Sequence, residues 1–80
     1  MIESFRHKGL RLLFETGERR LLNPQHIERI ENILGVIHAA EDTLSAELRG
    51  FWSVTVRANW RIIFRFERGK AFDVDLVDYH

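Results

Sequence analysis

Residues 51–80, FWSVTVRANWRIIFRFERGKAFDVDLVDYH, decide the fold. Large apolar side chains recur there at every second position in three runs, which is the period of a strand with one buried face. The segments RAN and RGK separate the runs and are short enough to be hairpin turns. This stretch therefore predicts three strands in an antiparallel meander.

The same alternation predicts which side chains of the meander face a core. We expect core positions at Trp52, Val54, Val56, Trp60, Ile62, Phe64, Phe66, Phe72, Val74 and Leu76. The opposite face should then contain Thr55, Arg57, Arg61, Ile63, Arg65, Asp73 and Asp75. We expect Arg65 to form a cross-strand ion pair with Asp73 or Asp75, worth a few tenths of a kcal/mol. Arg57 and Arg61 lie near the RAN turn, where acids are fewer, so their planar donors are free to hold a phosphate.

Upstream of the meander the apolar period becomes helical. Leu10, Leu13 and Phe14 fall on one stripe, and Gly17 suits the end of that helix. A second, stronger helix is predicted over residues 23–42, with an apolar stripe at Ile27, Ile30, Leu34 and Ile37.

Two further features refine the helical half. Asn23 is a good N-cap for the second helix, and Pro24 suits its first turn. Gly35 lowers helix propensity by about 1 kcal/mol relative to Ala, which suggests close packing against the first helix. Residues 2–5, IESF, predict a short edge strand. We therefore expect one α+β domain over residues 1–80, with two N-terminal helices packed on one face of an antiparallel three- to four-stranded sheet.

Composition excludes several classes of protein. The 80 residues suffice for one domain, they include no cysteine, and their formal net charge is zero. No apolar run approaches the roughly 20 residues that span a bilayer, and no secretory signal is apparent, so we expect a cytoplasmic protein. His7, His26 and His38 are isolated from other potential ligands, so no metal site or cofactor is expected.

Three ordered motifs resemble those of one known family. They are SF.HKGL..LFE.G near the start, WS..V..NWRI.F.F in the meander, and the ending DYH. Together they resemble HigB-type toxins, a branch of the RelE superfamily of bacterial toxin–antitoxin systems. The resemblance implies a RelE-like fold and an endonuclease that cuts mRNA in the ribosomal A site without a metal. It also implies a helix-turn-helix antitoxin as partner, HigA-like, through which the pair binds operator DNA.

The resemblance assigns roles to five positions. Arg57 and Arg61 match basic positions that hold the RNA backbone and stabilise the pentavalent phosphate. Asp78, Tyr79 and His80 match the acid–tyrosine–histidine ending found in the active site. Metal-free RNA cleavage needs a base, an acid and cations, and a histidine has a suitable unperturbed pKa of about 6.5.

One departure from the family pattern leaves an alternative open. Family members usually have a further strand before WSV, written roughly Y.LHPLKGD..G, which brings a histidine and a lysine to the site. This sequence runs from the second helix directly into FWSV, with Arg49 as the only basic residue nearby. The alternative is a catalytically weak or inert relative that only binds an antitoxin. A DNA-binding module acting alone is disfavoured, because no helix has a basic N-terminal face.

Overall fold

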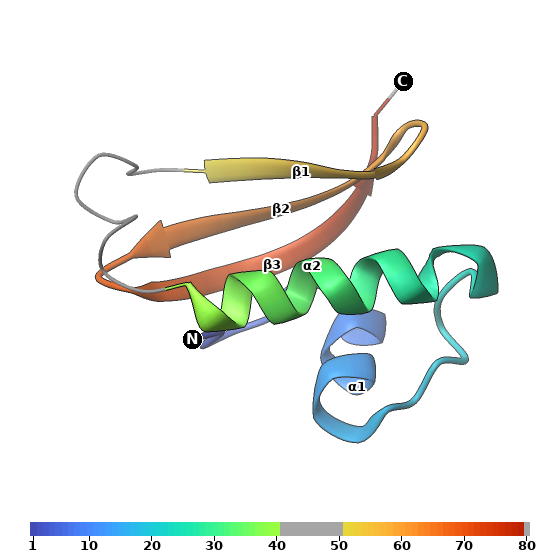
Figure 1. The fold of residues 1–80 in the computed structure, drawn as a ribbon, viewed down its shortest axis with the longest axis horizontal. Helices are drawn as coiled ribbons and strands as arrows, with labels where there is room; N and C mark the ends of the chain where they lie inside the picture. The colour runs from blue at the N-terminus through green and yellow to red at the C-terminus, as the bar shows by residue number, and fades with distance from the viewer. Residues whose placement is uncertain (41–50, 80) are drawn as a thin grey trace.

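The computed structural model describes residues 1–40 and 51–79. Its elements are α1 (Lys8–Thr16), the 3₁₀ turn η1 (Pro24–His26), α2 (Ile27–Ala39), β1 (Phe51–Arg57), β2 (Trp60–Glu67) and β3 (Lys70–Asp78). The strands form an antiparallel sheet in the order β1-β2-β3, and α2 runs across one of its faces (Figure 1). The predicted α+β class and the meander are therefore confirmed.

The helix boundaries follow from local capping. The Nδ1 atom of His7 accepts a hydrogen bond from the Leu10 amide at 3.2 Å, and Gly17 ends α1 with a φ of 79°. Asn23 Oδ1 accepts from the Gln25 amide at 2.9 Å, as expected of an N-cap. The first turn after Pro24 is 3₁₀ rather than α, and α2 ends at Ala39. Positions 41 and 42 of the predicted helix lie outside the described residues.

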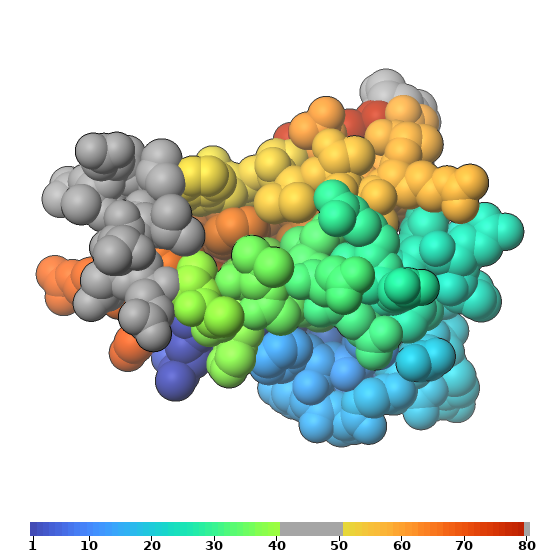
Figure 2. Space-filling view, viewed as in Figure 1, coloured from blue at the N-terminus to red at the C-terminus, as the bar shows by residue number. Residues whose placement is uncertain are grey.

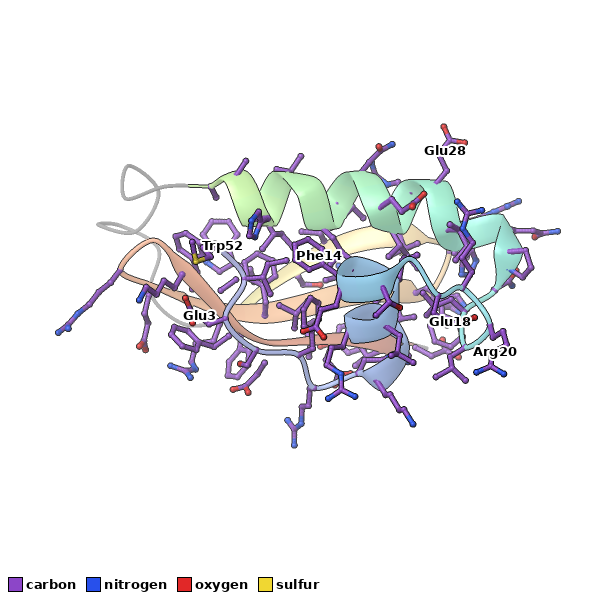
Figure 3. All side chains as sticks on the ribbon, turned by 90° about the horizontal axis from the view of Figure 1, so that it is seen from below. Glu3, Phe14, Glu18, Arg20, Glu28 and Trp52 are labelled. Carbon is purple, nitrogen blue, oxygen red and sulfur yellow. The ribbon has the colours of Figure 1, made fainter. Side chains whose placement is uncertain are left out.

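The core lies between α2, α1 and the helix-facing side of the sheet. Figure 2 shows α2 in green across the molecule, with α1 in blue below it and the β1–β2 hairpin above. The apolar stripe of α2 is buried as predicted, and Glu28 points away from the body on the outer side of the helix (Figure 3). The buried core residues are Leu10, Leu13, Leu22, Ile27, Ile30, Ile33, Leu34, Ile37, Val56, Ile62, Phe64, Phe66, Ala71 and Val74. Trp52 and Trp60 pack against this cluster, which confirms their predicted role.

The expected close approach at Gly35 is wrong. A Cβ atom added at Gly35 would meet nothing within 4 Å. The close approach occurs at Gly9, where an added Cβ would lie 2.8 Å from His7 Cε1 and 3.1 Å from Leu21 Cβ. The capping histidine folds back over the start of α1, so a Cβ atom at Gly9 would require the His7 ring to shift.

The alternation predicted for β3 is also wrong at Phe72. Asp73 has a φ of 55°, and the pairing register shifts between Ile63 and Arg65. The extra residue of this bulge reverses the phase, because a shift of one residue moves side chains to the other face. Ala71 and Val74 are therefore the buried residues of β3, and Phe72 pairs with Arg65 on the face away from the helices.

The N-terminal segment lies along the outer edge of β3. Ile2 and Phe5 form isolated parallel bridges to Ala71 and Val74, and four backbone hydrogen bonds of 2.7–3.1 Å join residues 1–6 to those two positions. Residues 2–5 thus lie at a sheet edge as expected, but within the described residues they do not form a continuous fourth strand. No described helix is long and apolar enough to cross a membrane.

Candidate functional site

The end of β3 returns to the turn between β1 and β2. Arg61 pairs with Val77, Trp60 pairs with Asp78, and the Tyr79 amide donates to the Asn59 carbonyl at 2.8 Å. Figure 1 shows this end of β3 beside the β1–β2 hairpin. The antiparallel register therefore brings residues that are about twenty positions apart in sequence to one rim of the sheet.

Arg61 and Tyr79 form the centre of this rim. The guanidinium carbon of Arg61 lies 5.6 Å from the centroid of the Tyr79 ring, and Arg61 Nη1 donates to Ser53 Oγ at 3.3 Å. Tyr79 is 55% exposed. Among residues 1–40 and 51–79, no carboxylate makes an ion pair with Arg61. Its charge is thus held in place by an aromatic ring and a hydroxyl, neither of which neutralises it.

The other predicted site residues do not all lie beside Arg61 and Tyr79. Arg57 is exposed at the end of β1, after a register shift that sets it opposite Trp60, and it forms no ion pair with a described residue. Asp78 remains in the ladder opposite Trp60, so strand alternation directs its side chain to the face opposite Tyr79. His80 lies outside the described residues, as does Arg49.

Arg65 lies on the same face as Arg61 but is tied to acids. Its Nη1 lies 3.0 Å from Glu67 Oε2, and its Nη2 lies 3.7 Å from Asp73 Oδ2. Its guanidinium also lies 4.8 Å from the centroid of the Phe72 ring. The predicted cross-strand pair of Arg65 with Asp73 is confirmed.

The three other histidines have structural contacts. His7 caps α1, His26 is buried with its ring 6.1 Å from that of Trp60, and His38 Nδ1 accepts from the Ile2 amide at 3.2 Å. In the part of the chain that the structure describes, no three His, Asp or Glu side chains gather as metal ligands.

Ser53 is a partner of Arg61 that residue spacing alone does not predict. Ser53 lies two residues before Thr55, which pairs with Arg61, so the two side chains are diagonal neighbours on one face. The register of the β1–β2 hairpin could have revealed this contact, because the position of the turn determines which residues are diagonal neighbours. Together, Ser53, Arg61 and Tyr79 form a surface suited to a phosphate beside a stacked base.

Two comparisons with known proteins concern the family of the chain. Residues 3–80 match the model of a family described as the RelE-like toxin of type II toxin–antitoxin system HigB. The chain is also similar to the endoribonuclease HigB of Proteus vulgaris, with 41% identity over 92 aligned positions that cover all of both chains. The alignment is twelve positions longer than this 80-residue chain, so part of the relative has no counterpart here. The chain therefore belongs to the HigB family of RelE-like toxins of type II toxin–antitoxin systems, in which an antitoxin is the partner.

Proposed function

We propose that this chain is an endoribonuclease toxin that cuts mRNA in the ribosomal A site without a metal. The observation that carries the proposal is the Arg61–Tyr79 pair, in which an arginine free of described carboxylates lies 5.6 Å from an exposed ring. The name of the Proteus vulgaris relative supports RNA cleavage as the reaction class.

The proposed reaction uses the 2′-hydroxyl of the RNA as its nucleophile. The 2′-oxygen attacks phosphorus, the P–O5′ bond breaks, and the products are a 2′,3′-cyclic phosphate and a 5′-hydroxyl. Arg61 and Arg57 offset the negative charge that develops on the phosphorane. His80 and Tyr79 move the two protons, or Tyr79 stacks on a base, and Asp78 is included in the site by the resemblance alone.

Cleavage of mRNA on programmed ribosomes tests this function. The purified chain should cut at the A-site codon, leave a cyclic phosphate, and leave the same mRNA intact when ribosomes are omitted. An mRNA with a 2′-deoxy nucleotide before the scissile bond should resist cutting, because its nucleophile is missing. Products with a 5′-phosphate, or cutting of the deoxy substrate, would point to activated water as the nucleophile and refute the proposed chemistry.

A second candidate is a weak or inert relative that retains only antitoxin binding. The twelve positions of the alignment without a counterpart in this chain favour it. The family pattern includes a motif with a histidine and a lysine before WSV, and this sequence does not contain that motif. A positioned acid–base group is worth roughly 10²–10⁴ in rate, so cleavage should fall to a small fraction of the Proteus vulgaris protein's rate. Equal rates for the two proteins under the same conditions would exclude this candidate.

The partner that we propose is a helix-turn-helix antitoxin encoded by the adjoining gene. The complex, rather than this chain alone, would bind operator DNA, and the toxin would act on ribosomes in the cytoplasm. Co-expression followed by affinity purification should yield a stable complex. An adjoining gene product that does not bind at micromolar concentration would refute this assignment.

A further inference from the structure

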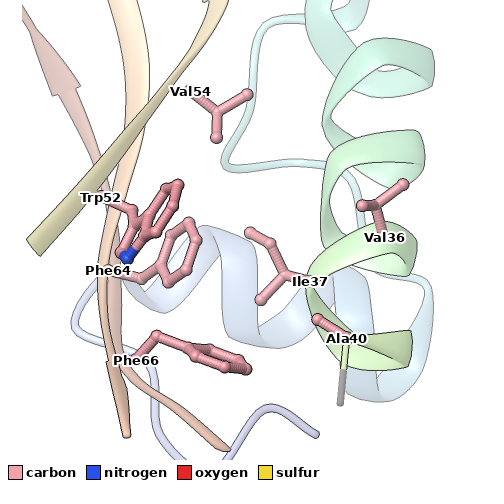
Figure 4. Close-up of a pocket in the computed structure, with 7 residues that line it drawn as sticks. All are labelled: Val36, Ile37, Ala40, Trp52, Val54, Phe64 and Phe66. Carbon is pink, nitrogen blue, oxygen red and sulfur yellow. The ribbon is translucent and has the colours of Figure 1, made fainter. Parts of the chain in front are cut away.

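An apolar groove runs between α2 and β1, away from the Arg61–Tyr79 rim. One part of it is a pocket of about 190 Å³ lined by Val36, Ile37, Ala40, Trp52, Val54, Phe64 and Phe66. Figure 4 shows the aromatic side chains of the sheet facing the α2 side chains across this pocket. A second part, of about 240 Å³, shares Val36, Ile37 and Val54 with the first, so the two are continuous along α2.

The groove exposes apolar surface on its helix wall. Val36 lies outside the buried apolar stripe of α2 and is 72% exposed. On the facing strand, Trp52 and Val54 are only partly buried. A single exposed apolar residue is ordinary, but Val36 lies beside the partly buried Trp52 and Val54, so the groove has one apolar wall on α2 and another on β1.

The outer edge of β1 lies beside this groove. Arg29 Nη2 on α2 donates to the Thr55 carbonyl at 3.2 Å, which shows that Thr55 directs its backbone groups outward. Residues two apart in a strand point to the same edge, so the N–H groups of Ser53 and Thr55 face outward as well. Trp52 and Val54 direct their side chains to the groove face, as their lining positions show. The edge thus combines backbone groups suited to strand pairing with pockets for alternate side chains.

Charge decides between possible occupants. Arg29 is the one charged residue among the named lining residues of the two parts, and it lies at the end of the groove near Thr55. The β1 strand of a second copy, FWSVTVR, contains no carboxylate and ends in Arg57. A second copy that paired through its own β1 would therefore offer Arg29 no acid from that strand, whereas a partner segment with an Asp or Glu would complement it.

We propose that this groove is the docking site of an extended segment of the antitoxin. The segment pairs with the outer edge of β1, places alternate apolar side chains against Val36, Trp52 and Val54, and pairs a carboxylate with Arg29. The inference rests on the antitoxin partner that the family implies, and it holds whether or not the chain cleaves RNA.

Binding of the full-length antitoxin from the adjoining gene, measured by calorimetry, tests the site. Val36→Asp should weaken binding by about tenfold or more, because it places a charge in the groove opposite apolar side chains. Leu21→Asp is the matched control, since Leu21 is a 51% exposed apolar residue in the loop before η1 and does not line the groove. It should leave affinity within about twofold of wild type, as expected of a residue outside the contact. Both variants should melt as the wild-type chain does.

Amide hydrogen exchange tests the strand pairing. Exchange at Ser53 and Thr55 should slow in the complex, with little change at Trp52 and Val54, whose amides face β2. Wild-type binding by Val36→Asp, or equal loss in both variants, would overturn the proposal. So would a wild-type chain that fails to bind the antitoxin. Self-association of the chain that Val36→Asp abolishes, with antitoxin affinity intact, would assign the groove to a second copy. The ribosome cleavage assay contains no antitoxin, so failure there would leave this site standing.

Discussion

Arg61 and Arg65 occupy equivalent places on β2 but have different surroundings. Both lie on the face away from the helices, and both place a guanidinium over an aromatic ring, at 5.6 Å from Tyr79 and 4.8 Å from Phe72. Arg65 also meets two carboxylates, those of Glu67 and Asp73, whereas Arg61 meets only the Ser53 hydroxyl among its described polar partners. At one end of this sheet face Arg65 is therefore neutralised, whereas at the other end Arg61 meets no carboxylate of the described residues.

The difference shows that an aromatic neighbour alone does not indicate a binding arginine. A ring orients a guanidinium without consuming its charge, and a carboxylate offsets that charge. The rim at Tyr79 thus suits a phosphate, and the end at Phe72 suits stabilisation of the hairpin between β2 and β3.

The largest effect is expected from Arg61→Ala. Removing one charge-stabilising donor typically costs about 2.7–4 kcal/mol in barrier height, or roughly 10²–10³ in rate. Growth arrest on induction should vanish, and A-site cleavage should fall by that factor, while Arg65→Ala should change cleavage little. Equal losses in the two variants would mean that both arginines serve the reaction and that carboxylate pairing does not separate them.

The next largest effect is expected from Tyr79→Ala, compared with Phe72→Ala. Loss of a stacking platform for a base costs about 1–3 kcal/mol, and Arg61 also loses the ring that orients it. Cleavage should therefore fall about 5- to 150-fold for Tyr79→Ala. Phe72→Ala should retain most activity, because Phe72 contacts the neutralised arginine. Tyr79→Phe then separates the ring from the hydroxyl: retained activity indicates stacking, and lost activity indicates proton transfer.

The sequence predicted most of the framework on which these experiments depend. Alternation in residues 51–78 predicted the strands, their antiparallel order and the ion pair of Arg65 with Asp73, and helical stripes predicted α1 and α2. Phe72 was assigned to the wrong face because β3 has a bulge at Asp73, whose φ is positive. A bulge depends on the partner strand and leaves no periodic pattern in the sequence, so alternation alone does not reveal it. The predicted close packing at Gly35 was wrong for a similar reason. A glycine inside a helix shows that the helix tolerates it there, but it does not show which residues lie beside it.

The candidate site was predicted less completely than the fold. Pattern and resemblance selected Arg61 and Tyr79, which the structure brings into contact. They did not select Ser53, because a diagonal neighbour follows from strand register rather than from residue spacing. Strand pairing continues as far as Asp78, which lies opposite Trp60, and the point at which pairing stops depends on the partner strand rather than on the residues of β3 alone.

A smaller effect is expected on stability, where Arg65→Ala should cost more than Arg61→Ala, the reverse of their order in cleavage. Arg65→Ala removes a cation–π contact worth about 0.5–1 kcal/mol and two largely exposed ion pairs worth a few tenths each. The free energy of unfolding should fall by about 1 kcal/mol, which lowers Tm by roughly 4–8 °C in a domain of this size. Arg61→Ala removes a cation–π contact at longer range and one exposed hydrogen bond to Ser53, and should cost about half as much or less. A urea titration of both variants gives the comparison, and a larger loss for Arg61→Ala would contradict it.

The smallest effect is expected from Asp73→Asn, which should make Arg65 resemble Arg61. Asparagine tolerates the positive φ at this position and keeps the side-chain shape, so the bulge should persist. With one of its two carboxylate partners neutralised, Arg65 should gain the ability to contact a phosphate of single-stranded RNA. One additional phosphate contact steepens the dependence of log K on log salt by about 0.7. Asp75→Asn is the matched control, because it changes net charge equally, whereas the Asp75 carboxylate accepts from the Leu76 amide and does not pair with Arg65. Titration of a short RNA at several salt concentrations should show the steeper slope for Asp73→Asn alone. Equal steepening in both variants would assign the effect to overall charge rather than to release of Arg65.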